Sequence, residues 1–164
     1  MKMTYEWLAY TGAEEDQVRK MLYRHAVEAR MRARSYRDFR VGAALIAWSH
    51  ESSSWEVFRG MNTKVSKNAR PVCAEAIAIA AAEAAGVMQI NDIVIVGNPR
   101  EEDETRTLHP CDECRQFMWH SKLIHRETRI ITALPPPQSS AYETHTMEKL
   151  LKRHGDVPYF RRLE

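Results

Sequence analysis

The sequence lacks the features that mark membrane proteins, disulfide-stapled proteins and nucleic-acid-binding proteins. None of its apolar runs approaches the ~20 residues of a membrane-spanning helix, so no membrane partner is expected. Only three cysteines occur in 164 residues, and three cannot all pair as disulfides. The formal net charge of +2 is too small to indicate nucleic acid as a partner. What remains is a globular chain with free or metal-bound thiols.

The composition, with 44% apolar and 28% charged residues, is typical of a soluble globular protein. A chain of this length can bury about two-thirds of its unfolded surface, and residues 1–164 are predicted to form a single domain. The first thirty residues are charged and helix-like, which argues against a secretory signal. We therefore expect a cytoplasmic protein whose thiols stay reduced.

Hydrophobic periodicity predicts alternating helices and strands. The apolar run from Val41 to Trp48 is typical of a buried strand, and the alanine-rich run from Cys73 to Ala85 is typical of a buried helix. We expect helices near residues 13–34, 73–85, 111 onward and 142–154, and strands near 41–48, 55–60, 92–97 and 129–134. This order predicts the α/β class, as a three-layer α/β/α fold with a mixed central sheet.

All three cysteines lie in two short stretches, Cys73-Ala-Glu and Pro-Cys111-Asp-Glu-Cys114. Thiolates are strong zinc ligands, and a catalytic zinc site usually has three protein ligands and one position open for water. Cys111 and Cys114 are three residues apart and so share one face of the helix that follows Pro110. The three cysteines therefore predict a site for Zn²⁺.

Glu75 stands two residues after Cys73, too close in sequence to point far from the metal. A first ligand followed by x-Glu, with a later Pro-Cys-x-x-Cys, is the signature of zinc deaminases. In that signature the glutamate is a general acid/base and not a ligand. The alternative is a carboxylate that only stabilises the start of a helix. We predict that Glu75 is catalytic.

Other interpretations of the cysteines explain fewer residues. A redox Cys-x-x-Cys pair accounts neither for Cys73 nor for Glu75. A closed structural zinc site needs a fourth ligand, for which His109 is the nearest candidate, but such a site does not require Glu75. The remaining histidines are expected on helices or loops without ligand spacing and are interpreted as ordinary polar residues, namely His25, His50, His120, His125, His145 and His154.

With these motifs in place, the chain resembles the cytidine deaminase family from about residue 35 to 160. The likeness is to its small homotetrameric branch and to the related blasticidin S deaminases. The segments that carry it are Ser35-Tyr36-x-x-Phe39-x-Val41-Gly42-Ala43-Ala44-Leu45, Gly60-x-Asn62, Cys73-Ala74-Glu75, Pro110-Cys111-x-x-Cys114-Arg115-Gln116, and the C-terminal Leu150-Leu151 with Tyr159 and Phe160.

The resemblance implies a zinc-dependent hydrolase, built as a homotetramer, that binds a small nucleoside. It implies that Phe39 lines the base pocket, that Asn62 contacts the sugar, and that the backbone of Ala74 contacts the base. A C-terminal aromatic side chain, Phe160 in this chain, would help to cover the pyrimidine.

The chain departs from the family pattern at two positions. Lys64 stands where cytidine deaminases have a glutamate that holds a ribose hydroxyl, and a cation cannot accept that hydrogen bond. Lys64 therefore either points away or meets an acceptor or anion on the substrate. Ala76 replaces an arginine that hydrogen-bonds the thiolates, so Arg115 is the best remaining group to compensate their charge.

The leading functional hypothesis is deamination of cytidine or deoxycytidine, in pyrimidine salvage. The alternative is the same chemistry on a modified aminopyrimidine nucleoside such as blasticidin S, with Lys64 facing an acidic group. Two further classes are nucleic-acid binding through the arginine-rich residues 30–40 and a zinc-stabilised assembly protein without catalysis. The near-neutral charge disfavours the first, and Glu75 disfavours the second.

Overall fold

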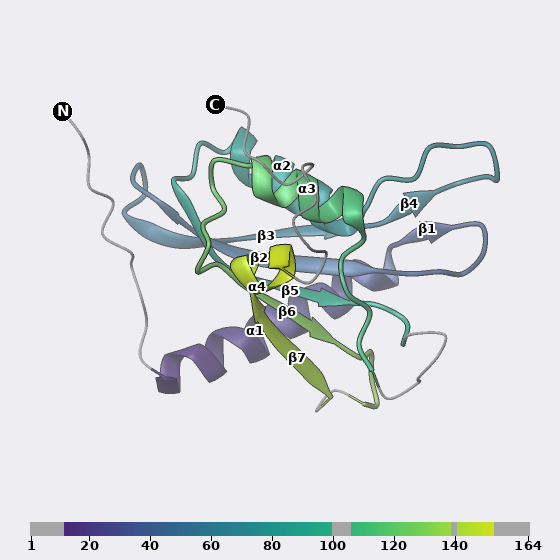
Figure 1. Ribbon diagram of the computed structural model, residues 1–164, viewed down its shortest axis with the longest axis horizontal. Coiled ribbons are helices and arrows are strands. Elements are labelled where there is room, and N and C mark those ends of the chain that lie inside the picture. The colour runs from purple at the N-terminus through teal and green to yellow at the C-terminus, as the bar shows by residue number, and fades with distance from the viewer. Residues whose placement is uncertain (1–11, 100–105, 139–140, 153–164) are drawn as a thin grey trace.

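The computed structural model of the chain describes residues 12–99, 106–138 and 141–152. Its centre is a five-stranded sheet of order β3-β2-β5-β6-β7 (Figure 1). The strands span β2 Gly42–Ser49, β3 Ser54–Met61, β5 Gln89–Val96, β6 Arg129–Ala133 and β7 Tyr142–Thr146. β2 pairs antiparallel with β3 and β5, β5 is parallel to β6, and β6 is antiparallel to β7. The predicted mixed sheet is confirmed.

Helices cover both faces of this sheet (Figure 1). Helix α1, Gly12–Met31, lies on one face, and helices α2, Ala74–Ala84, and α3, Asp112–His120, lie side by side on the other. The short α4, Met147–Lys152, follows β7 directly. The three-layer α/β/α arrangement is therefore confirmed, and both stretches that carry cysteine are on the same side of the sheet.

The strand β2 shows why its sequence is continuously apolar. Ala43 and Leu45 belong to the core beneath α2 and α3, whereas Ala44 and Ile46 belong to the core beneath α1. Successive side chains of a strand point to opposite faces, so a strand covered on both faces needs apolar residues at every position. The sheet thus separates two cores, one of which supports the α2 and α3 layer.

Two glycines let helices approach the sheet more closely than a side chain would allow. A Cβ on Gly60 of β3 would lie 2.1 Å from the carbonyl oxygen of Ala74, at the start of α2. A Cβ on Gly42 of β2 would lie 2.0 Å from the carbonyl oxygen of Ala26 in α1. Both contacts are with backbone atoms, so neither could be relieved by a side-chain rotation. Gly60 in particular sets how close the first turn of α2 comes to the sheet.

The first helix is shorter than the sequence predicts. It ends at Met31 instead of residue 34, and Arg34–Ser35 forms a short strand, β1. This strand pairs in parallel with β4, Thr63–Lys64, directly after β3. The pairing supplies backbone partners that a sequence pattern cannot show, since they lie almost thirty residues further along the chain.

The predicted helix over residues 142–154 is wrong in its first half. Residues Tyr142–Thr146 form β7, and helical structure begins only at Met147. The segment Tyr-Glu-Thr-His-Thr contains β-branched residues and alternates in burial, which fits a strand at the edge of a sheet. It pairs along the whole of β6, and this tertiary pairing outweighs the local helical pattern.

Within residues 12–99, 106–138 and 141–152, no helix combines the length and apolarity needed to cross a bilayer. The C-terminal residues Tyr159 and Phe160, for which a role over the base is predicted, lie outside the described part of the chain.

Candidate active site

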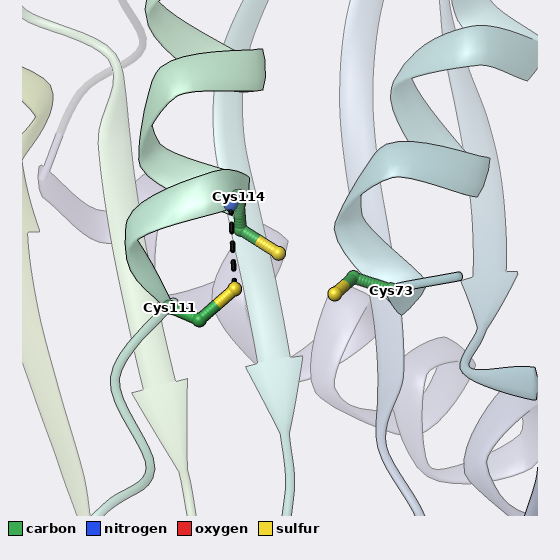
Figure 2. Close-up of side chains that lie close together, drawn as sticks. All are labelled: Cys73, Cys111 and Cys114. Atoms are coloured by element: carbon green, nitrogen blue, oxygen red, sulfur yellow. Dashed lines mark hydrogen bonds between the residues drawn. The ribbon is translucent and has the colours of Figure 1, made fainter. Parts of the chain in front are cut away.

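The three cysteine sulfurs converge between the starts of two helices (Figure 2). Cys73 is the residue immediately before α2, and Cys111 is the residue immediately before α3. Cys114 lies in the first turn of α3, on the same side as Cys111. The three Sγ atoms lie within 4.8 Å of one another. The structure thus brings together all three cysteines that the sequence motifs predicted.

Local backbone structure fixes the two cysteines of the second motif. The N–H of Cys114 donates a hydrogen bond to Sγ of Cys111, with 3.4 Å between nitrogen and sulfur (Figure 2). This is the bond of an N-capping side chain, so the start of α3 is stabilised by the cysteine that it positions. The helix dipole at this end favours thiolate over thiol.

The three cysteine thiols differ in pKa. The pKa of Cys111 is lowered because the side chains of Cys114 and Cys73 donate hydrogen bonds to its sulfur, and because two backbone N–H groups do the same. The pKa of Cys114 is raised, since it is a donor to Cys111. Cys111 is therefore the first of the three sulfurs to become a thiolate.

This donor set fits a zinc ion with an open coordination position. The three cysteine sulfurs could hold a metal ion, and within the described residues His109 does not join their group. His109 instead lies with Glu143 and His145 in a separate cluster. A closed site with His109 as fourth ligand is therefore not the arrangement found, and a position is left for water or substrate.

Glu75 lies in the first turn of α2 beside these sulfurs and is 5% exposed. Burial raises its pKa to about 7, and the negative charge of the Cys111 thiolate adds to this effect. A backbone hydrogen bond and one from Cys114 act in the opposite direction but do not cancel the effect of burial. A carboxyl group whose pKa is near neutrality can both accept and release a proton at physiological pH, as a general acid/base must.

A cavity of about 520 Å³ opens beside the sulfurs and Glu75. It is large enough for a nucleoside-sized ligand. One wall comes from the segment between α1 and β2 and from β4, and the other from the start of α2 and the loop before α3. The lining residues are Ser35, Tyr36, Arg37, Phe39, Val41, Asn62, Thr63, Lys64, Pro71, Val72, Cys73, Ala74, Glu75, Leu108, His109 and Cys111. Every predicted substrate-contacting residue inside the described ranges lines this cavity.

Asn62 has a structural task within the wall of the cavity. Its Oδ1 accepts a hydrogen bond of 2.7 Å from the N–H of Val41, and its Nδ2 donates one of 2.7 Å to the carbonyl oxygen of Phe39. These bonds hold the Phe39 segment against the end of β3. An amide has two donor hydrogens and two oxygen lone pairs, so one of each remains for a ligand.

Two cations gather around the face of Tyr36 at this cavity. Lys64 Nζ lies 5.8 Å from the ring centroid, and Arg37 Cζ lies 5.2 Å from it. Distances of this size permit cation–π attraction, which would hold both side chains near the cavity wall. Lys64, at the position where the family has a glutamate, thus lines the cavity instead of pointing away from it.

Two arginines of the arginine-rich stretch, Arg30 and Arg40, have partners within the protein. Arg30 donates to Oδ1 of Asn98 at 2.7 Å and to the carbonyl oxygen of Arg40 at 3.0 Å. Arg40 itself pairs with Asp38 at 2.8 Å. Of these arginines, Arg37 lines the cavity.

Arg115 is buried, at 5% exposure, and anchors the second cysteine motif. Its Nε donates to the carbonyl oxygen of Pro110 at 2.9 Å, and its Nη1 donates to that of Leu150 at 3.3 Å. These contacts tie the residue before Cys111 to α4. Compensation of the thiolate charge by Arg115 stays a prediction, since these contacts are with carbonyl oxygens.

Sequence reasoning missed the cluster of His109, Glu143 and His145. The predicted helix would have pointed Glu143 and His145 in different directions, whereas β7 places them on one face of the sheet. The expectation that His145 lies on a helix or loop is therefore wrong. The available signal was a carboxylate and a histidine two residues apart, Glu143 and His145, together with His109 beside the cysteine motif.

Comparisons with known proteins agree with this geometry. A model of the cytidine and deoxycytidylate deaminase zinc-binding region matches residues 16–129. The structure is similar to that of cytidine deaminase from Burkholderia pseudomallei, with 25% identity and a TM-score of 0.63, over 80% of this chain and 94% of that one. Comparison with curated protein sequences gives no significant match.

Two mycobacterial structures share the fold at lower identity. Cytidine deaminase from Mycobacterium leprae is 24% identical with a TM-score of 0.55, over 81% of this chain and 96% of that one. Cytidine deaminase from Mycobacterium tuberculosis is 22% identical with a TM-score of 0.56, over 84% of this chain and 97% of that one. Because the family model spans well over half of the chain, and its matched residues include the three cysteines and Glu75, this chain belongs to the cytidine and deoxycytidylate deaminase family of zinc-dependent hydrolases.

Proposed function

We propose that this protein hydrolyses a free cytosine nucleoside, cytidine or deoxycytidine, to the uracil form and releases ammonia. The observation that carries the proposal is the position of Glu75, a buried carboxyl group that lines the cavity beside three convergent sulfurs. A site that only stabilised the fold would need neither the cavity nor this carboxyl group.

Cys73, Cys111 and Cys114 are the proposed ligands of Zn²⁺. The chemistry that the ion supplies when bound is acidification of a water molecule, whose pKa falls from 15.7 toward ~7 in favourable sites. The protein contributes two rigid helix starts that hold the sulfurs, so the water and the substrate meet in a fixed geometry.

Glu75 is the proposed carrier of protons. Its carboxylate takes a proton from the attacking water and delivers it to N3 of the cytosine ring while a C4–O bond forms. It then passes the second proton of the water to the amino group as the C4–N bond breaks and ammonia leaves. One carboxylate can serve each transfer because the atoms concerned are adjacent, and a pKa near neutrality suits both directions.

The other cavity residues are proposed to orient the base and the sugar. The backbone of Ala74 and Cys111 meets the polar edge of the base, and Phe39 packs against the ring. Asn62 offers its remaining donor and lone pair to a sugar hydroxyl. We further propose Phe160 as the aromatic side chain that covers the base.

A second candidate substrate is a modified aminopyrimidine nucleoside with an acidic group, such as blasticidin S. The observation that favours it is the pair of cations, Lys64 and Arg37, in the wall of the cavity. A carboxylate on an altered sugar could bind Lys64 where a ribose hydroxyl would find no acceptor.

A substrate panel tests the proposal. Zinc-loaded protein is incubated with cytidine, deoxycytidine, their monophosphates and blasticidin S, and loss of the amine is followed by the ultraviolet change. Turnover of cytidine or deoxycytidine with the highest kcat/KM supports the first candidate, and preference for blasticidin S supports the second. Activity on the monophosphates alone, or on none of the five, would overturn both.

The assembly and setting of the enzyme are also proposals. We propose that residues 1–164 form a single domain and that four copies assemble into a homotetramer, as the resemblance to the small cytidine deaminases implies. We place the enzyme in the cytoplasm, in pyrimidine salvage. Light scattering coupled to size-exclusion chromatography would give the mass of the assembly, and a monomer at working concentration would refute the tetramer.

A further inference from the structure

The cluster of His109, Glu143 and His145 is separate from the group of three cysteines, and the proposed deamination steps do not use it. His145 is 8% exposed, and the side chains of His109 and Glu143 are 10% and 27% exposed. Each of the three offers one ligand atom, and these atoms lie within 4.8 Å of one another. Ligand atoms this close together can all reach one bound cation.

The geometry of the cluster is convergent. The Nε2 atom of His109 lies 3.1 Å from Oε2 of Glu143. The rings of His109 and His145 meet edge to face, with centroids 4.9 Å apart and planes inclined at 68°. Glu143 and His145 are two residues apart on β7 and therefore point to the same side of the sheet. Their positions are fixed by pairing with Thr132 and Ile130 of β6.

We propose that His109, Glu143 and His145 form a second metal site that takes a divalent transition-metal ion such as Zn²⁺ or Co²⁺. Two imidazoles and one carboxylate are a donor set that these ions accept, with the remaining positions filled by water. The ion takes the place of the contact between His109 and Glu143, and each histidine ligates it as a neutral imidazole.

Neighbouring residues already orient the carboxylate. The buried Thr107 hydroxyl is hydrogen-bonded to Oε2 of Glu143 and lies 2.6 Å from the hydroxyl of Thr132. Contacts of this kind fix ligand orientation at metal sites. The positive charge of Arg106 would oppose the binding of a cation to Glu143. Its Nη2 lies 3.8 Å from Oε1 of Glu143, and the Arg106 side chain is half exposed. Because that guanidinium can move into solvent, it does not close the site.

A metal ion at this site would hold the loop before α3 in place. His109 stands two residues before Cys111 and lines the substrate cavity, whereas Glu143 and His145 belong to the sheet. An ion bound to all three would fasten one wall of the cavity to β7. The inference does not depend on the deamination reaction, because its readout is metal binding.

The test titrates Co²⁺ into tag-free, zinc-loaded protein. Zinc occupies the three thiolates more tightly than cobalt does, so added Co²⁺ reports on the other site. Elemental analysis and calorimetry should give one Co²⁺ per chain in addition to one zinc. The absorption spectrum should show weak d–d bands without the intense thiolate-to-cobalt band. Bound Co²⁺ should also raise the Tm.

Matched variants identify the ligands. His145→Ala and Glu143→Gln should each weaken Co²⁺ binding by at least about tenfold and abolish the rise in Tm. His120→Ala, which removes an exposed histidine of α3, should bind cobalt as the parent protein does. If His145→Ala fails to fold, cobalt binding by the isosteric variant Glu143→Gln tests whether this cluster is the metal site. Absence of cobalt uptake by the parent protein, or unchanged uptake by Glu143→Gln, would overturn the proposal.

Discussion

The two side-chain clusters beside the substrate cavity are built in opposite ways. The cysteine cluster joins the first turns of two helices, α2 and α3, and each of its sulfurs is placed by local helix geometry. The cluster of His109, Glu143 and His145 joins a loop to the edge strand β7 and depends on strand pairing. The first has soft sulfur donors around an open position, and the second has nitrogen and oxygen donors.

The two clusters differ in whether a carboxyl group is left to transfer protons. A buried carboxyl group, Glu75, stands beside the sulfurs but is not a member of the group that could hold a metal ion, so it is available to move protons. In the other cluster the only carboxylate, Glu143, is itself a ligand candidate and is held by Thr107 and His109. These contacts support our proposals that the cysteine cluster and Glu75 carry out catalysis and that the other cluster holds the loop before α3 against β7.

A change of glutamate to glutamine, made at Glu75 or at Glu143, should give the largest difference in turnover between the two clusters. Glu75→Gln should lower kcat by about 10⁴-fold, the upper end for loss of a general acid/base, because one group carries every proton transfer. Zinc content should stay at that of the parent protein. Steady-state kinetics on cytidine measure kcat, and elemental analysis measures the zinc content.

Two controls accompany this variant. Glu83→Gln removes a charge from the same helix, at an exposed position where the amide can still accept from Ser121, and should leave turnover unchanged. Glu143→Gln should instead alter cobalt uptake. An active Glu75→Gln enzyme would remove catalysis from the cysteine cluster.

The next largest effect is expected at Gly60, which brings the start of α2 against the sheet. In Gly60→Ala the added Cβ would meet backbone atoms of Ala74, so α2 must shift. Overpacking of this kind typically lowers the free energy of unfolding by about 1–3 kcal/mol. Displacement of Cys73 should also weaken zinc binding, and chemical denaturation with a competing chelator would measure both changes.

Gly97→Ala is the matched control for this prediction. Its Cβ would meet the end of the Leu108 side chain at 2.8 Å, and a side chain can turn away where a backbone cannot. A smaller loss of stability is expected, with zinc affinity near that of the parent protein. Equal losses in the two glycine variants would show that the position of α2 does not govern the site.

The cysteine cluster could be predicted from the sequence because the geometry within each of its two stretches is local. Spacing of three residues places Cys111 and Cys114 on one side of a helix, and two residues keep Cys73 and Glu75 in one turn. The layers of the fold were also predictable, since Val41–Trp48 and the alanine-rich α2 have clear patterns. That the two cysteine stretches meet was predicted from the zinc-ligand pattern of all three cysteines, because local spacing alone does not bring Cys73 to Cys111.

The second cluster could not be predicted because it depends on pairing across the chain. Residues 142–146 have a weak pattern that fits helix or strand, and the open edge of β6 decides between them. The short β1 and β4 pair is of the same kind. The sequence suggests for His109 only the role of a fourth ligand of the cysteine site, since no sequence pattern places β7 beside it.

A third variant tests the cavity that both clusters border. Lys64→Glu restores the acceptor that the family uses for a ribose hydroxyl. A charged hydrogen bond contributes about 1.5–3 kcal/mol, so kcat/KM for cytidine should rise by about tenfold or more. For a substrate with a carboxylate, such as blasticidin S, it should fall. Opposite shifts in the two substrates are the expected result, and no change in either would place Lys64 outside the substrate contacts.

The smallest effect is expected at Thr107, which orients Glu143. Thr107→Val keeps the shape of the side chain but removes its hydroxyl. Loss of such a supporting contact typically lowers metal affinity about 10–100-fold, and we expect the lower end for cobalt. The free energy of unfolding without added cobalt should fall by only about 0.5–1.5 kcal/mol. A fall in stability with no change in cobalt affinity would favour a purely structural cluster.

X-ray absorption at the zinc edge tests the central claim most directly. For protein with one zinc per chain, we predict three sulfur neighbours at about 2.3 Å and one lighter neighbour at about 2.0–2.2 Å that belongs to water. Addition of a substrate analogue should change the shell of the light atom and leave the sulfurs in place. A shell with fewer than three sulfurs, or with a histidine ring as the fourth neighbour, would contradict the account.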